Sequence, residues 1–384
     1  MWVTVAINMV GFGIVIPIVP LYAKRFHASS AEATLLIAAY SAASLVFSPL
    51  WGRLSDRVGR RPVLLLSLVG TAAGSLLTGM AGGLVLLFVG RIVDGASGST
   101  VSVAQAAVGD LAAPDQRPRL FGLIGAAFGL GFVAGPAIGA LAAAAGPRVP
   151  FYVAAGIAGA NALVALRRLP ETLPENRRGD RVRGVPRDGL RGANLAPLLV
   201  VSFCALTAFS AFEATLAIFG HHRFGLSIGS AAGTFAVVGV VLVAVQGALV
   251  RPLVARLGEK HTLDAGLAAE GLGLLLLAFA RDWVLAVPAL AALTVGQALV
   301  QTTMASTLSG RVAADRRGQL LGLQQSAGGL GRVVGPAVGG VLLGSGASGG
   351  PYVMGAAVCA VALVVIQATR TSPVRSDSSH VTLK

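Results

Sequence analysis

The stretch DQRPRLFGLIGAAFGLGFVAGPAIGA, residues 115–140, recurs 200 residues later as DRRGQLLGLQQSAGGLGRVVGPAVGG, residues 315–340. The two segments are identical at 14 positions, and these include the acid Asp115/Asp315 and the prolines Pro136/Pro336. A shared spacing of this length predicts that the chain is built from two related halves.

The composition places both halves in a membrane. Hydrophobic residues make up 55% of the 384 residues and charged residues only 12%, too few charges to cover a soluble protein of this size. A membrane-spanning helix needs about 20 apolar residues, and such segments must be helical to satisfy their backbone. The runs that satisfy this are 2–22, 33–52, 63–81, 84–108, 119–144, 149–167, 195–219, 227–250, 262–280, 283–308, 319–343 and 351–369.

These spans predict an all-α membrane protein of twelve transmembrane helices. Each half has an even number of spans, so both copies cross in the same direction, which is the parallel six-helix repeat of a major-facilitator fold. We expect an N-terminal half at 1–167, a polar cytoplasmic linker at 168–194, a C-terminal half at 195–369 and a cytoplasmic tail at 370–384.

The net charge of +14 is distributed unevenly between the two sides of these spans. Of the 30 Lys and Arg residues, 23 fall on one alternating set of loops and the tail, 2 fall inside spans, and the other loops carry Lys24, Arg25, Arg148, Arg223 and Arg281. The positive-inside rule makes the rich side cytoplasmic. We therefore expect a multi-pass protein of the plasma (inner) membrane with both termini in the cytoplasm, and no nucleic-acid partner.

A charged segment, GRLSDRVGRRP at 52–62, lies between the second and third apolar runs. It resembles the loop 2–3 signature of the major facilitator superfamily, and FVAGPAIG at 132–139 resembles the span 5 motif of its drug–proton antiporters. RIVDG at 91–95 resembles the family's span 4 arginine motif. Segments 246–259, 268–271 and 317–322 are similar to the tetracycline-efflux branch, although Asn8 replaces an aspartate of that branch and 63–81 holds no acid.

The resemblance implies that the charged segment is a gate. Asp56 should face the N-terminus of span 11 near Gly318, where helix N-termini attract carboxylates, and Arg60 should reach Asp110. A solvated orienting loop is the alternative. The expected gating residues are Gly52, Asp56, Arg57, Gly59, Arg60, Arg61 and Asp110.

Arg91, Asp94, Glu213 and Glu270 are charged residues inside spans, where a charge is costly unless it is paired or faces water. Arg91 and Asp94 are three residues apart and share a helix face; the resemblance implies that this arginine helps control protonation. Burial of Glu270 and Glu213 favours a proton-binding role. We expect all four in proton coupling, with a satisfied structural pair or interior acid as the alternative.

Glycines repeat every four residues in spans 5 and 11, so each set lines one helix face for close packing. Pro136 and its copy Pro336 remove a backbone donor and should kink these helices. Simple packing or a hinge between the halves are both compatible with the pattern. The residues are Gly131, Gly135, Pro136, Gly139, Gly331, Gly335, Pro336 and Gly339.

Polar groups within spans are the candidate substrate contacts: Asn8, Gln105, Gln297, Gln301 and Arg332. Arg332 can instead form a structural pair. His221 and His222 fall in a short loop without companion ligands, so no metal site is expected. Cys204 and Cys359 are far apart in apolar runs and predict no disulfide.

Taken together, these features predict a monomeric, proton-coupled exporter of drug-like or amphiphilic small molecules. We expect no enzyme activity and no cofactor, and the chain lacks a P-loop for ATP. A sugar or metabolite transporter would share every structural signal, and a non-transporting membrane sensor is the third hypothesis. The bound partners would then be the small-molecule substrate, protons and the lipid bilayer.

Overall fold

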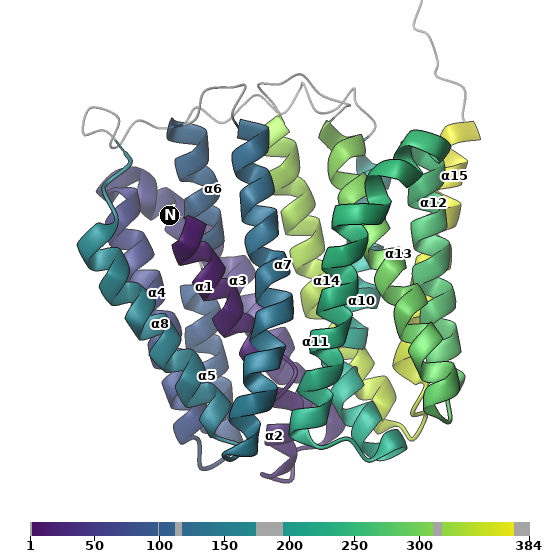
Figure 1. Cartoon of the computed structure of the whole chain (residues 1–384), viewed down its shortest axis with the longest axis horizontal. Coiled ribbons are helices and arrows are strands. Elements are labelled where there is room, and N and C mark those ends of the chain that lie inside the picture. The colour runs from purple at the N-terminus through teal and green to yellow at the C-terminus, as the bar shows by residue number, and fades with distance from the viewer. Residues whose placement is uncertain (1, 99, 112–116, 174–194, 310–316, 372–384) are drawn as a thin grey trace, which may run out of the picture.

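A computed structural model describes residues 2–98, 100–111, 117–173, 195–309 and 317–371. Every regular element in these ranges is helical, and the long helices run side by side across the bundle in Figure 1. The sequence prediction of an all-helical protein is therefore confirmed.

The N-terminal half contains α1 to α8. Their bounds are α1 (Trp2–Val15), α2 (Val19–Lys24), α3 (Ser30–Val58), α4 (Arg60–Met80), α5 (Leu84–Ser97), α6 (Thr100–Leu111), α7 (Arg117–Ala144) and α8 (Val149–Arg168). Local chemistry sets several ends. Ser29 and Glu32 form a reciprocal capping box at the start of α3, which satisfies two otherwise unpaired backbone donors.

The second set of helices starts at Ala196, and we refer to it as the C-terminal half. Its elements are α10 (Ala196–Phe224), α11 (Ile228–Ala244), the π-helical turn η2 (Val245–Leu249), α12 (Val250–Phe279), α13 (Trp283–Ser309), α14 (Arg317–Gly344) and α15 (Gly350–Thr371). Gly225 ends α10 in the left-handed conformation, which favours glycine. His221 and His222 lie in the last turn of α10, so their expected placement in a loop was wrong.

Eleven helical segments among the described residues are long and apolar enough to cross a membrane. One of them, Ile228–Phe279, is 52 residues long, far more than a single crossing requires. Gly258 interrupts its helical geometry with φ 76° and ψ 163°. The segment therefore consists of two helices that meet at a kink at Gly258.

The sequence analysis placed the charged segment 52–62 in a loop, but the structure shows it to be helical on both sides of Gly59. Helix α3 runs to Val58 and α4 starts at Arg60, so Gly59 alone separates them, with φ 106° and ψ 159°. A Cβ at Gly59 would also collide with the carboxylate of Glu171. Gly258 has a similar backbone conformation at the equivalent position of the second half, and the same break therefore occurs in both repeats.

The glycine faces of α7 and α14 pack against equivalent helices in the two halves. A Cβ at Gly131 would lie 2.6 Å from the backbone of Met9, and one at Gly135 would lie 2.6 Å from Gly13, both on α1. In the second half, Gly331 and Gly335 pack closely against α10. Both helices continue through their prolines without a break.

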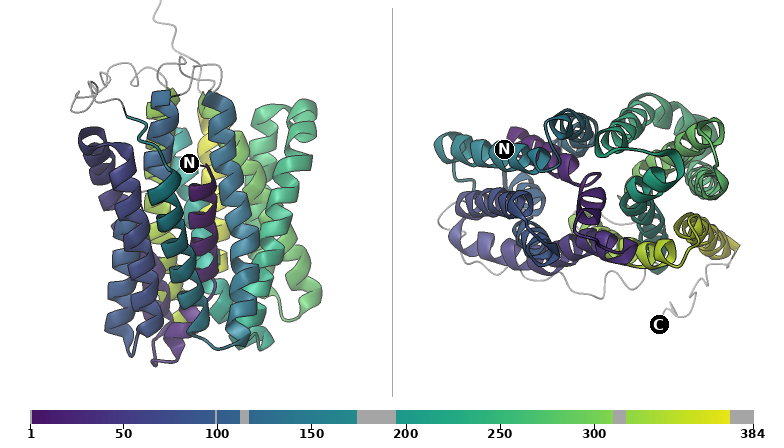
Figure 2. Two further views of the ribbon diagram at one scale, coloured as in Figure 1. Left: turned by 60° about the vertical axis from the view of Figure 1, so that its left-hand side comes forward. Right: turned by 90° about the horizontal axis from the view of Figure 1, so that it is seen from below.

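The two halves contact each other along α3 with α14 and along α7 with α11, the helices that lie between the halves in the views of Figure 2. One hydrophobic cluster joins both halves; its members include Ile14, Ile18 and Leu36 from the first half and Ile218 and Leu343 from the second. The other hydrophobic clusters of the described residues each belong to a single half. The shared cluster lies at the end of the bundle opposite Gly59 and Gly258; we call the end with these two glycines the basic end.

Candidate functional site

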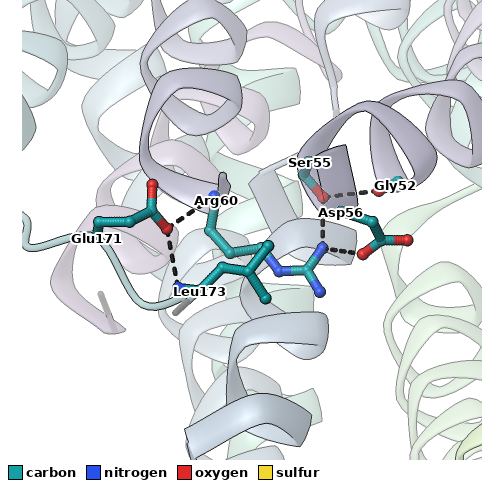
Figure 3. A network of polar contacts seen from close by, with 6 residues as sticks. All are labelled: Gly52, Ser55, Asp56, Arg60, Glu171 and Leu173. Atoms are coloured by element: carbon teal, nitrogen blue, oxygen red, sulfur yellow. Dashed lines mark hydrogen bonds and ion pairs between the residues drawn. The ribbon is translucent and has the colours of Figure 1, made fainter. Parts of the chain in front are cut away.

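The α3–α4 junction at the basic end carries a compact polar network, drawn in Figure 3. A guanidinium nitrogen of Arg60 lies 2.6 Å from the carboxylate of Asp56, one helical turn before it, and donates a 2.5 Å hydrogen bond to Ser55. The Ser55 hydroxyl in turn donates to the carbonyl of Gly52 at 2.8 Å. Arg60 is only 4% exposed, so the ion pair connects the last turn of α3 to a buried arginine at the start of α4.

Glu171, which follows α8, binds the N-terminus of α4. Its carboxylate accepts backbone N–H bonds from Arg60 at 2.9 Å and from Arg61 at 3.1 Å. It also accepts them from Thr172 at 2.8 Å and Leu173 at 3.0 Å. Partial burial would raise the pKa of Glu171, but these four backbone donors outweigh it and hold the pKa below its usual range.

The remaining expected gating residues are arranged around this network. Arg61 also donates from its side chain to the carbonyl of Leu166 at 2.6 Å, whereas Arg57 is exposed at the end of α3. The expected contacts of Asp56 with the start of α14 and of Arg60 with Asp110 involve side-chain positions outside the described residues. Among the described acids, Arg60 pairs with Asp56.

Arg91 and Asp94 form an ion pair deep in the N-terminal half. Their closest atoms are 2.8 Å apart, and the side chains are 2% and 8% exposed. The guanidinium also stacks on Tyr40 of α3, with its carbon 4.4 Å from the ring centroid, a favourable contact between a cation and an aromatic face. Pairing on one side and stacking on the other make a buried arginine tolerable here.

Each member of this ion pair lines a different cavity, Asp94 the first and Arg91 the second. The first, the N-half cavity, is enclosed by helices of the first half and is lined by Ile7, Asn8, Gly11, Phe12, Tyr40, Thr71, Ser75, Asp94, Ala154 and Ala158. The second, the interface cavity, takes its lining from both halves: Phe12, Ile16, Ile37, Tyr40, Ser41, Arg91, Ser210, Glu213 and Arg332. Phe12 and Tyr40 line both, with ring centroids 5.3 Å apart.

Two charges of the C-terminal half line the interface cavity. Glu213 on α10 is 4% exposed, and its Oε1 has no hydrogen-bond partner. Arg332 on α14 is half-buried. The short ion pairs of the described residues join Asp56 to Arg60 and Arg91 to Asp94, and they leave Glu213 and Arg332 facing the same cavity without joining them.

Glu270 lies elsewhere. It is on α12 and completely buried, and neither carboxylate oxygen has a hydrogen-bond partner. Its backbone packs against Gly296 of α13, and it is not among the lining residues of the two cavities. An unpartnered acid in such a site is costly when charged.

The five expected substrate contacts are dispersed. Asn8 lines the N-half cavity and leaves its buried Oδ1 unpartnered, and Arg332 lines the interface cavity. Gln297 is 3% exposed on α13, whereas Gln301 is exposed and accepts a 3.0 Å bond from Gln246. Gln105 is half-buried on α6. The structure therefore brings Asn8 and Arg332 to the cavities and leaves the three glutamines outside their linings.

The sequence comparison identifies the family directly. The Major Facilitator Superfamily profile matches residues 1–258 and 247–382. The chain belongs to this superfamily. It is 34% identical over 376 residues to the tetracycline resistance protein, class C, of Escherichia coli, covering 95% of this chain and 94% of that protein. It is also 26% identical to multidrug resistance protein 2 of Bacillus subtilis (strain 168), covering 88% and 86%.

Solved structures have the same fold. The human organic anion transporter MFSD10 superposes with a TM-score of 0.73 at 23% identity, covering 95% of this chain and 97% of that one. A bacterial homolog of the human lysosomal transporter Spinster, in an inward-facing and occupied conformation, gives 0.78 at 13% identity, covering 97% and 96%. The protein is thus a multi-pass membrane transporter of the major facilitator superfamily, homologous to tetracycline and multidrug efflux proteins, and not an enzyme.

Two residues of this transporter's polar networks escaped the sequence analysis. Tyr40 lies 51 positions before Arg91 in an ordinary apolar run, and only helix packing brings them together. Glu171 stands in the segment Leu169-Pro-Glu-Thr-Leu173, which the sequence analysis assigned to a polar linker. Leu169 and Leu173 are buried, so the first part of this segment packs against the N-terminal half. The two leucines on either side of the acid were the sequence feature that could have predicted this packing.

Proposed function

We propose that this transporter exports drug-like or other amphiphilic small molecules in exchange for protons, by alternating access. The observation that carries the proposal is the interface cavity, which is lined by both halves and contains Arg91, Glu213 and Arg332. Such a cavity between two related halves is where major-facilitator proteins bind their substrates. Apolar walls suit an amphiphile, and Glu213 supplies a carboxylate that can exchange a proton.

The membrane arrangement follows from the break at Gly258. Dividing the 52-residue segment there gives twelve crossings, in halves at 1–167 and 195–369, joined by a linker at 168–194 and followed by a tail at 370–384. We assign the basic end, and both termini, to the cytoplasm; the excess of arginine and lysine on one set of loops supports this orientation. The protein works as a monomer in the plasma (inner) membrane.

The shared hydrophobic cluster supports an inward-facing state. It closes the halves against each other at the outer end, while the described clusters towards the basic end stay within one half. The glycine faces of α7 and α14 serve as hinges in the exchange. In the opposite state, Asp56 binds the start of α14 near Gly318, Arg60 reaches Asp110, and the gate made by Gly52 to Arg61 closes the cytoplasmic side.

A cysteine pair at positions 56 and 318 tests the gate. It should crosslink in the outward-facing state and separate when substrate holds the inward-facing state. A pair that never forms a crosslink under either condition would contradict the gate.

Proton coupling is assigned to the Arg91–Asp94 pair, with Glu213 and Glu270 as further proton-binding groups. Asp94 lines the N-half cavity while its partner lines the interface cavity, so a substrate that disturbs the pair also changes the protonation of Asp94. Everted vesicles carrying the protein and an acid interior test this. Adding an exported cationic dye should dissipate part of the proton gradient.

The variant Asp94→Asn should abolish this dissipation because it removes the proton-binding group. Asp282→Asn, which changes an exposed acid at the outer end of α13, is the matched control and should behave as the wild type. A gradient that no compound of a broad dye and drug panel disturbs would exclude the proposed function.

A further inference from the structure

The interface cavity contains one positive and one negative charge that are not paired with each other in this structure. Arg91 is already neutralised by Asp94. Arg332 and Glu213 remain, and they come from neighbouring helices α14 and α10. The Oε1 of Glu213 is an unpartnered acceptor in a side chain that is 4% exposed. Arg332 attracts this carboxylate across the cavity, but neither a hydrogen bond nor a close ion pair joins the two groups among the described residues.

Helix packing does not require Arg332. The equivalent position of the first half is Phe132, although α7 and α14 pack through matching glycine faces on α1 and α10. A cation inside a span is costly unless something binds it. The arginine is therefore an addition to the repeat, placed where a ligand can reach it.

We propose, on the basis of the proposed export function, that the interface cavity binds zwitterionic amphiphiles, with the ligand's acidic group on Arg332 and its amine on Glu213. The guanidinium presents a planar fork of donors that matches a carboxylate or sulfonate. The apolar body of the ligand lies against the adjacent rings of Phe12 and Tyr40, whose centroids are 5.3 Å apart.

A zwitterion fits this site better than a ligand with a single charge. A simple organic anion would satisfy Arg332 but leave Glu213 unpaired, and a simple cation would leave Arg332 unpaired. Either case leaves a desolvated charge without a partner, which weakens binding. A ligand that carries both charges satisfies both groups at once.

The assignment also links the ligand to proton exchange. The charged or titratable groups that face Glu213 across the cavity are Arg332 on α14, Arg91 on α5 and Tyr40 on α3. A proton on Glu213 removes the partner of the ligand's amine. Proton and substrate then exclude each other from the site, as an exchanger requires.

Three probes with one aromatic body test this on the full chain in lipid nanodiscs: 2-naphthylalanine, its methyl ester and its N-acetyl derivative. They carry both charges, the positive charge alone and the negative charge alone. The wild type should bind the zwitterion about ten- to a hundredfold more tightly than either analogue, as expected for a hydrogen-bonded charge. Equal affinities for the three probes would overturn the proposal.

The variants assign each charge. Arg332→Gln should remove the preference over the methyl ester, and Glu213→Gln should remove the preference over the N-acetyl compound. Arg281→Gln, which changes an exposed arginine at the outer end, is the matched control and should keep both preferences. An Arg332→Gln variant that keeps both preferences would show that Arg332 has only a structural role. Thermal melting of each variant shows that it is folded.

Comparing the nanodisc binding experiment with the vesicle export experiment separates this inference from the proposed function. Wild-type vesicles that export a cationic dye with protons while the nanodiscs do not discriminate between the probes would refute the zwitterion site alone. Discrimination between the probes without proton-coupled export of any compound would retain the site and refute the exchanger.

Discussion

Replacing Glu171 with glutamine should loosen the start of α4 without disturbing the rest of the transporter. Oε1 of the carboxylate accepts the N–H groups of Arg60, Thr172 and Leu173, and Oε2 accepts that of Arg61. Glutamine keeps one acceptor oxygen but places an amide group against the N–H of Arg61. It also removes a negative charge from a helix N-terminus, where such a charge is stabilising.

The size of the effect follows from these bonds. Losing the N-terminal cap of a helix costs about 0.5–2 kcal/mol, and glutamine should lose about 1 kcal/mol of local opening free energy because it keeps part of the contact. Glu171→Ala removes all four acceptor contacts and should lose about 2 kcal/mol. Because exchange from local openings follows their free energy, these values correspond to roughly fivefold and thirtyfold faster amide exchange.

Hydrogen exchange measured by mass spectrometry on the segment 59–66 provides the assay. Glu32→Gln is the matched control, because Glu32 caps α3 at the opposite end of the bundle; it should leave this segment unchanged. The pKa of Glu171 is lowered in the folded protein, so the stabilisation is complete above its unfolded value of about 4.3. It should decline as the pH falls through the folded value.

The difference between wild type and Glu171→Gln should accordingly be full at neutral pH and shrink in acid. Exchange of 59–66 that is equally slow in the wild type and in Glu171→Ala at pH 7 would show that the carboxylate does not hold this junction. A difference that grows as the pH falls would contradict the assigned charge state.

Two further substitutions test packing and the buried acid. Gly135→Ala should lower the melting temperature, corresponding to about 1–3 kcal/mol of overpacking, because its Cβ would lie 2.6 Å from Gly13. Gly156→Ala, with no atom within 4 Å of the new Cβ, is its control, and equal melting temperatures would contradict the close packing of α7 on α1. Glu270→Leu should raise the melting temperature, because the unpartnered buried acid that it removes destabilises the fold by about 1–3 kcal/mol. The same variant should abolish coupled export in everted vesicles. Unchanged export would remove Glu270 from the coupling mechanism.

The sequence was sufficient for the helices because their signal is local. Lipid requires long apolar runs, and α7, α8 and α13 begin and end within two residues of the predicted spans. The prediction of a loop at 52–62 was wrong because it also relied on a local signal, the density of charged residues. The charges of this segment resemble those of a loop, but backbone hydrogen bonding continues helically to Val58 and only Gly59 departs from it.

The polar sites were harder to predict because their partners lie far apart in the chain. Arg91 and Asp94 could be paired from their spacing along one helix, whereas Tyr40 reaches Arg91 only through the packing of α3 on α5. Glu213 and Arg332 were each identified as charges inside a span. Their common cavity could not be predicted, because spacing along the chain does not show which helix faces approach each other between the halves.

The internal repeat helps to interpret these polar residues, because each half can be compared with the other at equivalent positions. Both halves contain the glycine break, at Gly59 and at Gly258, but the adjoining contacts differ. The first break is held by Glu171, which comes from the end of its own half, whereas Glu259 beside the second break accepts hydrogen bonds from Ser306 and Thr307 of α13. The break that Glu171 stabilises is therefore the one in the N-terminal half.

The interface-cavity charges that form no close ion pair belong instead to the C-terminal half, where Arg332 replaces the phenylalanine of the repeat. If the gate and the ligand are handled by opposite halves, a ligand bound to Arg332 and Glu213 can affect the junction at Gly59 only by moving one half relative to the other. That is the motion that alternating access requires.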